Sequence, residues 1–365
     1  MVRKDRWTLD YYKYLKLDEV LSAQELQSAK AGEPVHTEML FIIVHQVYEL
    51  WFKLILHEVD SVIKMFAGDF IDERNIGTAV RRLQRVTDIQ KLLIEQVRVI
   101  ETMRPREFLD FRKLLGSASG FQSFQFRLLE NKLGLLPEAR IQYGNKPYYE
   151  DLSDEHKGII SSSEKEPNLF QVVERWLERT PFVKSAGFDF VEAYRHSCER
   201  VIAQERVEID QESSLRPDER ESKLKMVEKN LETFSSIFDS AAHQRLARAA
   251  QRRISHPALV AALFISLYRD EPILQLPFQL IESVIEIDEN FALWRNRHAL
   301  MVFRMIGRKV GTGESSGYDY LRRTIDSHRI FGDLFNLATY LIPKSELPKL
   351  PEKMAKNLAF HFSVM

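Results

Sequence analysis

Cysteine is almost absent from this chain of 365 residues, and glycine and proline are scarce. The one cysteine, Cys198, excludes an internal disulfide framework and a zinc site built on a CxxC pair. With only 14 glycines and 13 prolines, the sequence disfavours a loop-rich or all-β protein and favours long helices. We therefore expect an all-α protein from a reducing compartment.

An excess of charge of one sign is also lacking, as are long uncharged apolar runs. The 52 basic and 53 acidic residues leave a formal net charge of -1, and no basic block stands out, so no nucleic-acid partner is expected. No uncharged apolar run reaches about 18 residues, and the N-terminal segment lacks the apolar core of a signal peptide. These features predict a soluble, cytoplasmic protein with no membrane span.

Apolar and aromatic residues are plentiful, and they are densest around His45. Residues 40–52 form an apolar run with helical spacing and apolar side chains on nearly every face. Such a helix is expected to be buried almost all round. Because an unpaired polar group in an apolar site is costly, His45 either pairs inside the core or faces a cavity that holds a ligand.

The apolar periodicity predicts two long helices, over residues 37–66 and 72–101, packed as an antiparallel hairpin. Residues 1–30 are expected to form an N-terminal arm with a short helix near 18–28, and residues 31–365 the main domain. Residues 200–232 are dense in charge and are interpreted as an exposed excursion or helical hairpin. Further helices are expected over residues 106–115, 121–133, 169–178, 257–308 and 333–342.

A second lone histidine, His298, lies in another aromatic-rich helical segment. HExxH spacing is absent, which disfavours a structural or catalytic zinc site. Two single histidines on apolar helices suit a flat apolar cofactor instead, with one binding its iron and the other facing the opposite side. The alternative is that both are ordinary core residues.

Two polar features add to the pattern. Arg112 lies in an otherwise apolar helical turn, where it either pairs with Asp110 or offers a fork to a substrate carboxylate. Residues 311–317 are rich in glycine and hydroxyl side chains, without the lysine of a phosphate-binding loop. They form either a lid over a small polar ligand or a plain connection.

Long strings of this sequence resemble one known family, tryptophan 2,3-dioxygenase. The resemblance runs in order over about residues 11–345, and its matching strings are residues 14–18, 23–28, 40–53, 119–132, 176–181, 268–272, 294–298, 311–318 and 333–343. It implies an all-α helical-bundle haem dioxygenase fold, with residues 31–365 as the haem-binding catalytic domain. It also implies a homotetramer in which the N-terminal arm is exchanged between subunits.

The activity implied by the resemblance is the first step of tryptophan catabolism by the kynurenine pathway. With haem b in its ferrous form, such an enzyme inserts both atoms of O2 across the indole C2–C3 bond of L-tryptophan, giving N-formylkynurenine. His298 resembles the proximal ligand of the haem iron, and His45 the distal catalytic histidine near the indole N–H. The other residues matched to the site are Phe41 and Phe108 (indole pocket), Arg112 (substrate carboxylate), Thr312 (lid), Ser119 and Arg127 (beside the haem, with Arg127 near a propionate), and Tyr11, Tyr14 and Leu15 (reaching a neighbouring subunit's site).

Two positions depart from the family's usual pattern. Glu314 stands where the lid of relatives usually has glycine, and Val44 stands where relatives often have threonine. The departures leave open a related haem oxygenase that acts on a substituted tryptophan or inserts one oxygen atom. A non-catalytic haem-binding sensor is the further alternative, although the retained Arg112 and His45 favour an enzyme that acts on an α-amino acid.

Overall fold

The computed structural model describes residues 9–68, 71–141, 147–185, 187–307 and 317–359, and helices dominate all of these segments. The expected all-α class is confirmed. Strand structure in the described residues is limited to β1 (Lys184–Ser185) and β2 (Phe188–Asp189), which pair antiparallel with Ser185 opposite Phe188.

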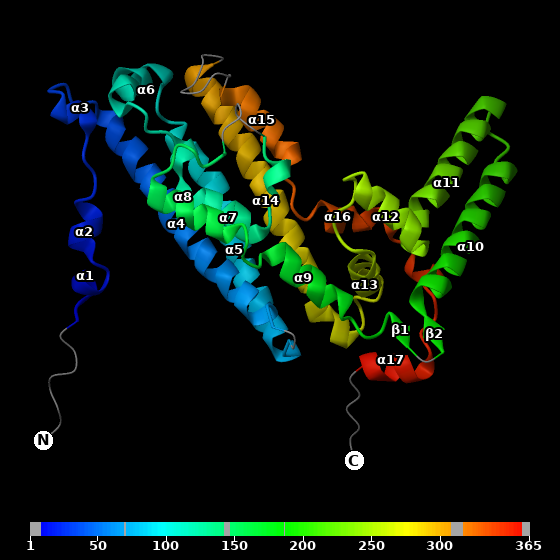
Figure 1. The fold of residues 1–365 in the computed structure, drawn as a ribbon. Helices are drawn as coiled ribbons and strands as arrows, with labels where there is room; N and C mark the ends of the chain where they lie inside the picture. The colour runs from blue at the N-terminus through cyan, green and yellow to red at the C-terminus, as the bar shows by residue number, and fades with distance from the viewer. Residues whose placement is uncertain (1–8, 69–70, 142–146, 186, 308–316, 360–365) are drawn as a thin grey trace, which may run out of the picture.

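The long helices α4 (His36–Phe66), α5 (Ile76–Ile100) and α14 (Gln275–Ile306) lie side by side in the body of the molecule (Figure 1). Helix α5 packs against both of the others, so the expected α4–α5 hairpin is present and α14 completes a layer. No glycine or proline interrupts α4, which ends at Phe66 with Ala67 as its C-cap.

Shorter helices make up much of the rest of the molecule. They are α6 (Pro105–Arg112), α7 (Phe124–Leu133), α8 (Asp154–Ser163), α9 (Leu169–Glu178), α13 (His256–Leu267), α15 (Gly317–Ser327), α16 (Gly332–Phe335) and α17 (Glu352–Leu358). Single 3-10 turns connect them: η1 (Glu73–Asn75), η2 (Lys113–Leu115), η3 (Gly120–Gln122), η4 (Pro137–Ala139), η5 (Pro272–Leu274), η6 (Asn336–Tyr340) and η7 (Lys344–Glu346).

Gly134 sets the junction between α7 and α9. Its φ of +109° lies in the left-handed region, and a Cβ there would lie 2.7 Å from Asn168 Oδ1 and 2.9 Å from the Cβ of Phe170. Asn168 in turn caps α9, since its side chain accepts from Gln171 N at 3.0 Å. The close approach therefore requires glycine where α7 ends against the start of α9.

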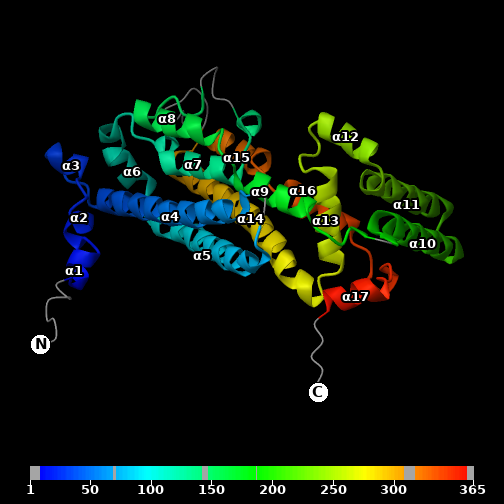
Figure 2. The same ribbon diagram turned by 60° about the horizontal axis from the view of Figure 1, so that its bottom comes forward.

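The charge-dense stretch lies in α10 (Phe190–Gln211) and α11 (Pro217–Phe238), which pack against each other and project from one end of the molecule beside α12 (Ser240–Arg248) (Figures 1 and 2). Ile202, Ile209 and Val227 form a small core of their own between the two helices. Proline at the first position of α11 begins that helix after the turn.

The N-terminal arm consists of α1 (Tyr11–Tyr14), α2 (Leu17–Leu21) and α3 (Gln27–Lys30), with α1 and α2 leading away from the body in both views (Figures 1 and 2). The single helix predicted over residues 18–28 is wrong. Gln46 of α4 donates to the Ala23 carbonyl at 2.9 Å, and Gln24 donates to Gln46 at 2.8 Å. These side-chain bonds take the place of the helical hydrogen bond that Ala23 would otherwise accept.

The main core lies between the C-terminal half of α4 and helices α5, α9, α13 and α14. Ile55, Val59 and Val62 are fully buried, whereas Ile43 and Leu50 in the N-terminal half of α4 are 43% and 56% exposed. The expectation that this helix is buried all round is therefore wrong for its N-terminal half in the single chain. In that N-terminal half, helix α5 packs against one side of α4, where the Tyr48 hydroxyl donates a hydrogen bond to the Leu93 carbonyl. By length and composition alone α4 is also a candidate membrane span, a property that core helices of soluble proteins share.

Candidate active site

His45 and Phe41 lie one turn apart on α4, so their side chains face the same way. Their ring centroids are 4.2 Å apart, and His45 Nδ1 lies 2.7 Å from the Phe41 carbonyl oxygen. Because a carbonyl oxygen only accepts, the proton of the neutral ring belongs on Nδ1. The other nitrogen of His45, Nε2, is then an acceptor for a donor from outside the helix.

The imidazole of His45 is solvent-accessible in this single chain, yet the surrounding protein atoms still shape its titration. Desolvation lowers the pKa of His45 below its ordinary value, and this outweighs the opposing effects of the Phe41 carbonyl and the Glu49 carboxylate. The ring is therefore neutral at physiological pH and retains its acceptor nitrogen.

Helix α6 supplies an aromatic wall next to His45. The Phe108 ring stacks on Phe41 with centroids 5.7 Å apart, and the fully buried Phe111 meets Phe41 edge-on at 5.6 Å. Proline begins α6, and Glu107 accepts from Arg104 N at 2.7 Å, which fixes the first turn. The result is an apolar, aromatic surface of the kind that accommodates a flat ring.

Arg112 ends α6, with its guanidinium carbon 6.0 Å from the centroid of the Phe108 ring. Within the described residues it forms no ion pair, and Asp110 is not its partner. Among the described residues, the fork of donors on its guanidinium therefore has no carboxylate partner, and it lies beside the aromatic wall, where a ligand carboxylate has access to it.

His298 comes from α14, and its ring lies parallel to that of Trp294, with centroids 5.2 Å apart and planes 3° apart. Burial, together with the smaller effect of the charge of a protonated His45, lowers the pKa of His298 to about 4. The helices that carry the two histidines meet close to them, because the ring of Tyr48 on α4 and the ring of Trp294 on α14 have centroids 6.1 Å apart. Among the described residues, the buried Nδ1 of His298 has no hydrogen-bond partner.

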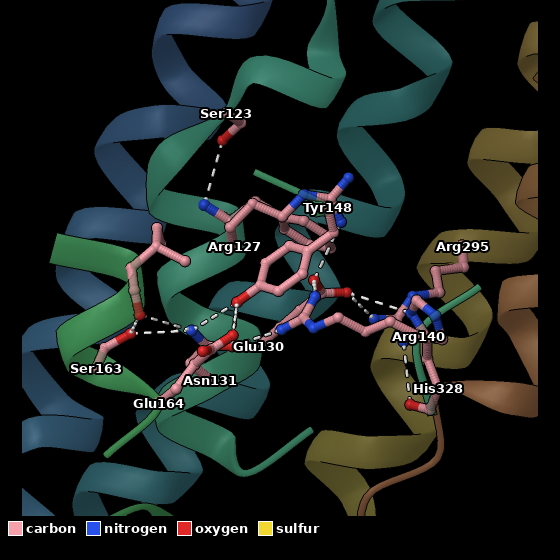
Figure 3. Close-up of polar contacts among 12 residues, drawn as sticks. Ser123, Arg127, Glu130, Asn131, Arg140, Tyr148, Ser163, Glu164, Arg295 and His328 are labelled. Atoms are coloured by element: carbon pink, nitrogen blue, oxygen red, sulfur yellow. Dashed lines mark hydrogen bonds and ion pairs between the residues drawn. The ribbon is translucent and has the colours of Figure 1, made fainter. Parts of the chain in front are cut away.

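Ser119 and Arg127 are already engaged within the chain. Ser119 precedes η3, where its Oγ accepts from Phe121 N at 3.3 Å. Arg127, on α7, is 7% exposed and donates to Glu130 Oε2 at 3.2 Å (Figure 3). Their assignment to a haem remains a prediction.

Three of the remaining predicted site residues do not join the others in the single chain. Tyr11, Tyr14 and Leu15 are 74%, 70% and 40% exposed and belong to the arm that leads away from the body (Figure 1). Thr312 and Glu314 lie outside the described residues.

Phe111 and Trp294 line the site but were missed by the sequence reasoning. Phe111 follows Phe108 by three residues, and Trp294 precedes His298 by four. Both spacings place side chains next to each other on a helix. Helical spacing from Phe108 and from His298 was therefore a signal in the sequence that could have identified them.

Comparison with known proteins decides the family. A family model described as tryptophan 2,3-dioxygenase matches residues 2–341. The chain belongs to the tryptophan 2,3-dioxygenase family. A tryptophan 2,3-dioxygenase of Dictyostelium discoideum is 45% identical over 97% of this chain and 89% of its own length. One from Alteromonas mediterranea is 45% identical over 96% and 97%, and tryptophan 2,3-dioxygenase B of Danio rerio is 46% identical over 95% and 85%.

The side chains of this tryptophan 2,3-dioxygenase family member fit a haem. A neutral imidazole is the form that ligates iron, and burial keeps His298 neutral. Its buried Nδ1 lacks a hydrogen-bond partner among the described residues, so hydrogen bonding within this part of the chain does not explain why the imidazole is buried there. The aromatic rings of Trp294 and Phe41 suit the flat apolar face of a macrocycle.

Proposed function

We propose that this chain is a haem-dependent tryptophan 2,3-dioxygenase. It adds both atoms of O2 across the indole C2–C3 bond of L-tryptophan and yields N-formylkynurenine, the first step of the kynurenine pathway, in the cytoplasm. The observation that carries the proposal is the placement of His45 and His298 on two helices that meet through the rings of Tyr48 and Trp294. These two imidazoles, both with lowered pKa values, come from α4 and α14 and lie beside an aromatic wall that ends in Arg112, which has no carboxylate partner among the described residues.

In this proposal His298 holds the iron of haem b, and Ser119 and Arg127 lie beside the macrocycle, with Arg127 near a propionate. When bound in its ferrous form, the haem supplies the binding and activation of O2. The protein's part is to fix the position of the substrate and to exclude water.

The substrate's two ends need different surroundings. The indole ring packs against Phe41 and Phe108, whose rings already stack 5.7 Å apart. The indole N–H donates to Nε2 of His45, the acceptor left by the bond of Nδ1 to the Phe41 carbonyl. His45 thus orients the ring and does not need to remove a proton.

The amino-acid end is held by charge. Arg112 binds the substrate carboxylate through two parallel hydrogen bonds, a geometry that lysine does not reproduce. The Thr312 hydroxyl would accept from the substrate ammonium group, and a bound haem would supply a propionate as a further acceptor. These contacts select an α-amino acid over a bare indole.

The active form is a homotetramer in which the arm of one subunit completes the site of another. Two properties of the single chain support this assembly. Tyr11, Tyr14 and Leu15 have no core of their own to join, and Ile43 and Leu50 expose apolar surface on the half of α4 that carries His45.

Glu314 favours a second candidate, a haem oxygenase that acts on a substituted tryptophan. A glutamate in the lid adds a negative charge near the expected position of the substrate carboxylate, and a cationic substituent on the substrate would offset that charge.

Product analysis tests the proposal and separates the candidates. The haem-loaded protein is reduced without oxygen, mixed with L-tryptophan and then with 18O2, and the products are measured by mass spectrometry. We expect N-formylkynurenine with both oxygen atoms labelled. A product with one labelled atom, or turnover only of a substituted tryptophan, would favour the second candidate. Haem binding without any product would favour a sensor.

A further inference from the structure

A buried cluster of charged side chains surrounds Glu130 on α7 (Figure 3). Glu130 is 3% exposed, and three arginines from three parts of the chain reach its two oxygens. These are Arg127 at 3.2 Å and Arg140 at 2.5 Å on Oε2, and Arg295 at 2.9 Å on Oε1.

Glu130 is the carboxylate that contacts all three of these arginines, and Asp288 adds a further attraction to Arg295. Burial by itself raises the pKa of Glu130, but attraction to Arg140, the nearby His328 ring, and attraction to Arg127 and Arg295 hold it well below its usual range. Glu130 is therefore ionised, and its removal leaves three guanidinium groups buried with no carboxylate between them.

Glu130 joins elements that border the candidate active site. Arg295 belongs to α14, and its NH1 group also donates to the His328 carbonyl at 3.5 Å. His328 follows α15, is 2% exposed, and has its Nδ1 3.4 Å from Glu130 Oε1. The ends of α7 and α15 and the middle of α14 thus meet at one carboxylate.

A chain of contacts leads from this cluster to His298. Phe126 lies one turn before Glu130 on α7, and its ring meets both the Arg295 guanidinium, at 5.9 Å, and the Trp294 ring, at 5.2 Å. Trp294 stacks on His298 in turn. Because Arg295 precedes His298 by three residues, the rotation of α14 that brings Arg295 to Glu130 also sets the direction of His298.

We propose that Glu130 is a positioning residue for His298: by holding Arg295 against α7, it fixes the turn of α14 from which His298 faces His45. The proposal rests on the proposed function, in which His298 holds the haem iron. It assigns the Glu130 cluster a role in the geometry of the iron ligand, beyond its contribution to folding.

Glu58 offers a matched control. It is a buried carboxylate of α4, 5% exposed, and it pairs with two arginines, Arg85 at 2.5 Å and Arg82 at 3.8 Å. It lies 13 residues beyond His45, or about 20 Å along the helix axis. Loss of its charge should affect stability without reaching His298.

The experiment compares Glu130→Gln, Glu130→Asp and Glu58→Gln in the haem-loaded full-length protein. The readouts are the rate of haem transfer to excess apomyoglobin and the iron–histidine band in the resonance Raman spectrum of the ferrous protein. For Glu130→Gln we expect transfer about 10- to 100-fold faster, as is typical when a group that orients a metal ligand is lost, together with a shifted or broadened band. Glu130→Asp keeps the charge and should recover most of both properties.

Glu58→Gln should lower the melting temperature while leaving the iron–histidine band and the transfer rate at wild-type values. The proposal is overturned if Glu130→Gln and Glu58→Gln give the same band and the same transfer rate. If Glu130→Gln does not fold, the double variant Glu130→Gln with Arg140→Met removes one charge of each sign and should show the same shifted band. A wild-type band there would overturn the proposal. A wild-type protein without an iron–histidine band would instead refute the proposed function itself.

Discussion

The two histidines of the site differ in how the chain holds them. His45 is oriented by the carbonyl of Phe41, a bond within its own helix, whereas the buried Nδ1 of His298 has no partner among the described residues. From residue patterns alone, each was either a core histidine or a site residue. Only the family resemblance divided them into a distal and a proximal role. Their proximity depends on the packing of α4 and α14, which apolar periodicity does not encode.

Arg112 is the residue on which amino-acid recognition depends. The variant Arg112→Lys keeps the positive charge but loses the planar fork, so kcat/KM for L-tryptophan should fall by an amount corresponding to roughly 2–5 kcal/mol. Steady-state kinetics measure the change. Arg106→Lys, at an exposed position on the same helix, is the control and should be silent. Wild-type kcat/KM in Arg112→Lys would remove Arg112 from the site.

At the scale of elements, long and regular helices were the predictable part. The predicted bounds 37–66 and 72–101 agree closely with α4 and α5, because their apolar stripes are long and uninterrupted. The short helix near residues 18–28 was not predictable in the same way. There, hydrogen bonds that Gln46 of another helix donates to Ala23 and accepts from Gln24 decide the backbone conformation. The exposure of the N-terminal half of α4 was also not predicted. The apolar pattern of a sequence shows which side chains favour burial, but it does not show which helix or which subunit packs against them.

The lid loop carries the next prediction, which rests on sequence because Glu314 lies outside the described residues. If the fourth lid position adopts positive φ, Glu314→Gly should relieve both backbone strain and repulsion of the substrate carboxylate. The KM for tryptophan should then fall about tenfold if about 1.4 kcal/mol is recovered. Raised salt should shrink only the charge part of the effect. An unchanged or higher KM would mean that Glu314 is neutral or useful.

The packing of α12 on α13 should depend on pH through His243. Burial lowers the pKa of His243, and the positive charges of His256 and Arg252 lower it further, against the bond of His243 to the Ile254 carbonyl. The unfolded chain takes up this proton near pH 6.5 while the folded chain resists it, so the free energy of unfolding should fall as the pH drops below about 6.5. Urea unfolding at several pH values measures the slope. His243→Gln should flatten it, and the exposed His196→Gln should not; equal slopes in both variants would contradict the assignment.

For the whole molecule, the arm is the part that a single chain leaves unexplained. Tyr11 and Tyr14 are mostly exposed, and the arm's helices α1 and α2 lead away from the body (Figure 2). The resemblance predicted an arm exchanged between subunits, and no property of the isolated chain tests that exchange. The exchange stays a prediction because the apolar periodicity of one sequence does not show whether a residue packs on its own chain or on a neighbouring subunit.

Deletion of residues 1–15 should reduce the size of the oligomer, the activity, or both, while the helical circular dichroism spectrum stays nearly unchanged. The physical reason is that these residues add little to their own chain's core, so their loss acts between subunits. Deletion of residues 1–8 alone keeps α1 and serves as the control. Light scattering and turnover measure the result, and a fully active monomer after the longer deletion would contradict shared active sites.

The central claim of the account is that His298 holds the haem iron opposite His45. Its most direct test is the optical and resonance Raman spectrum of His298→Gly with haem, before and after addition of free imidazole. We predict that the variant loses the iron–histidine band and releases haem readily, and that imidazole entering the vacated space restores both the band and retention. Wild-type spectra and haem retention in His298→Gly without imidazole would contradict the claim.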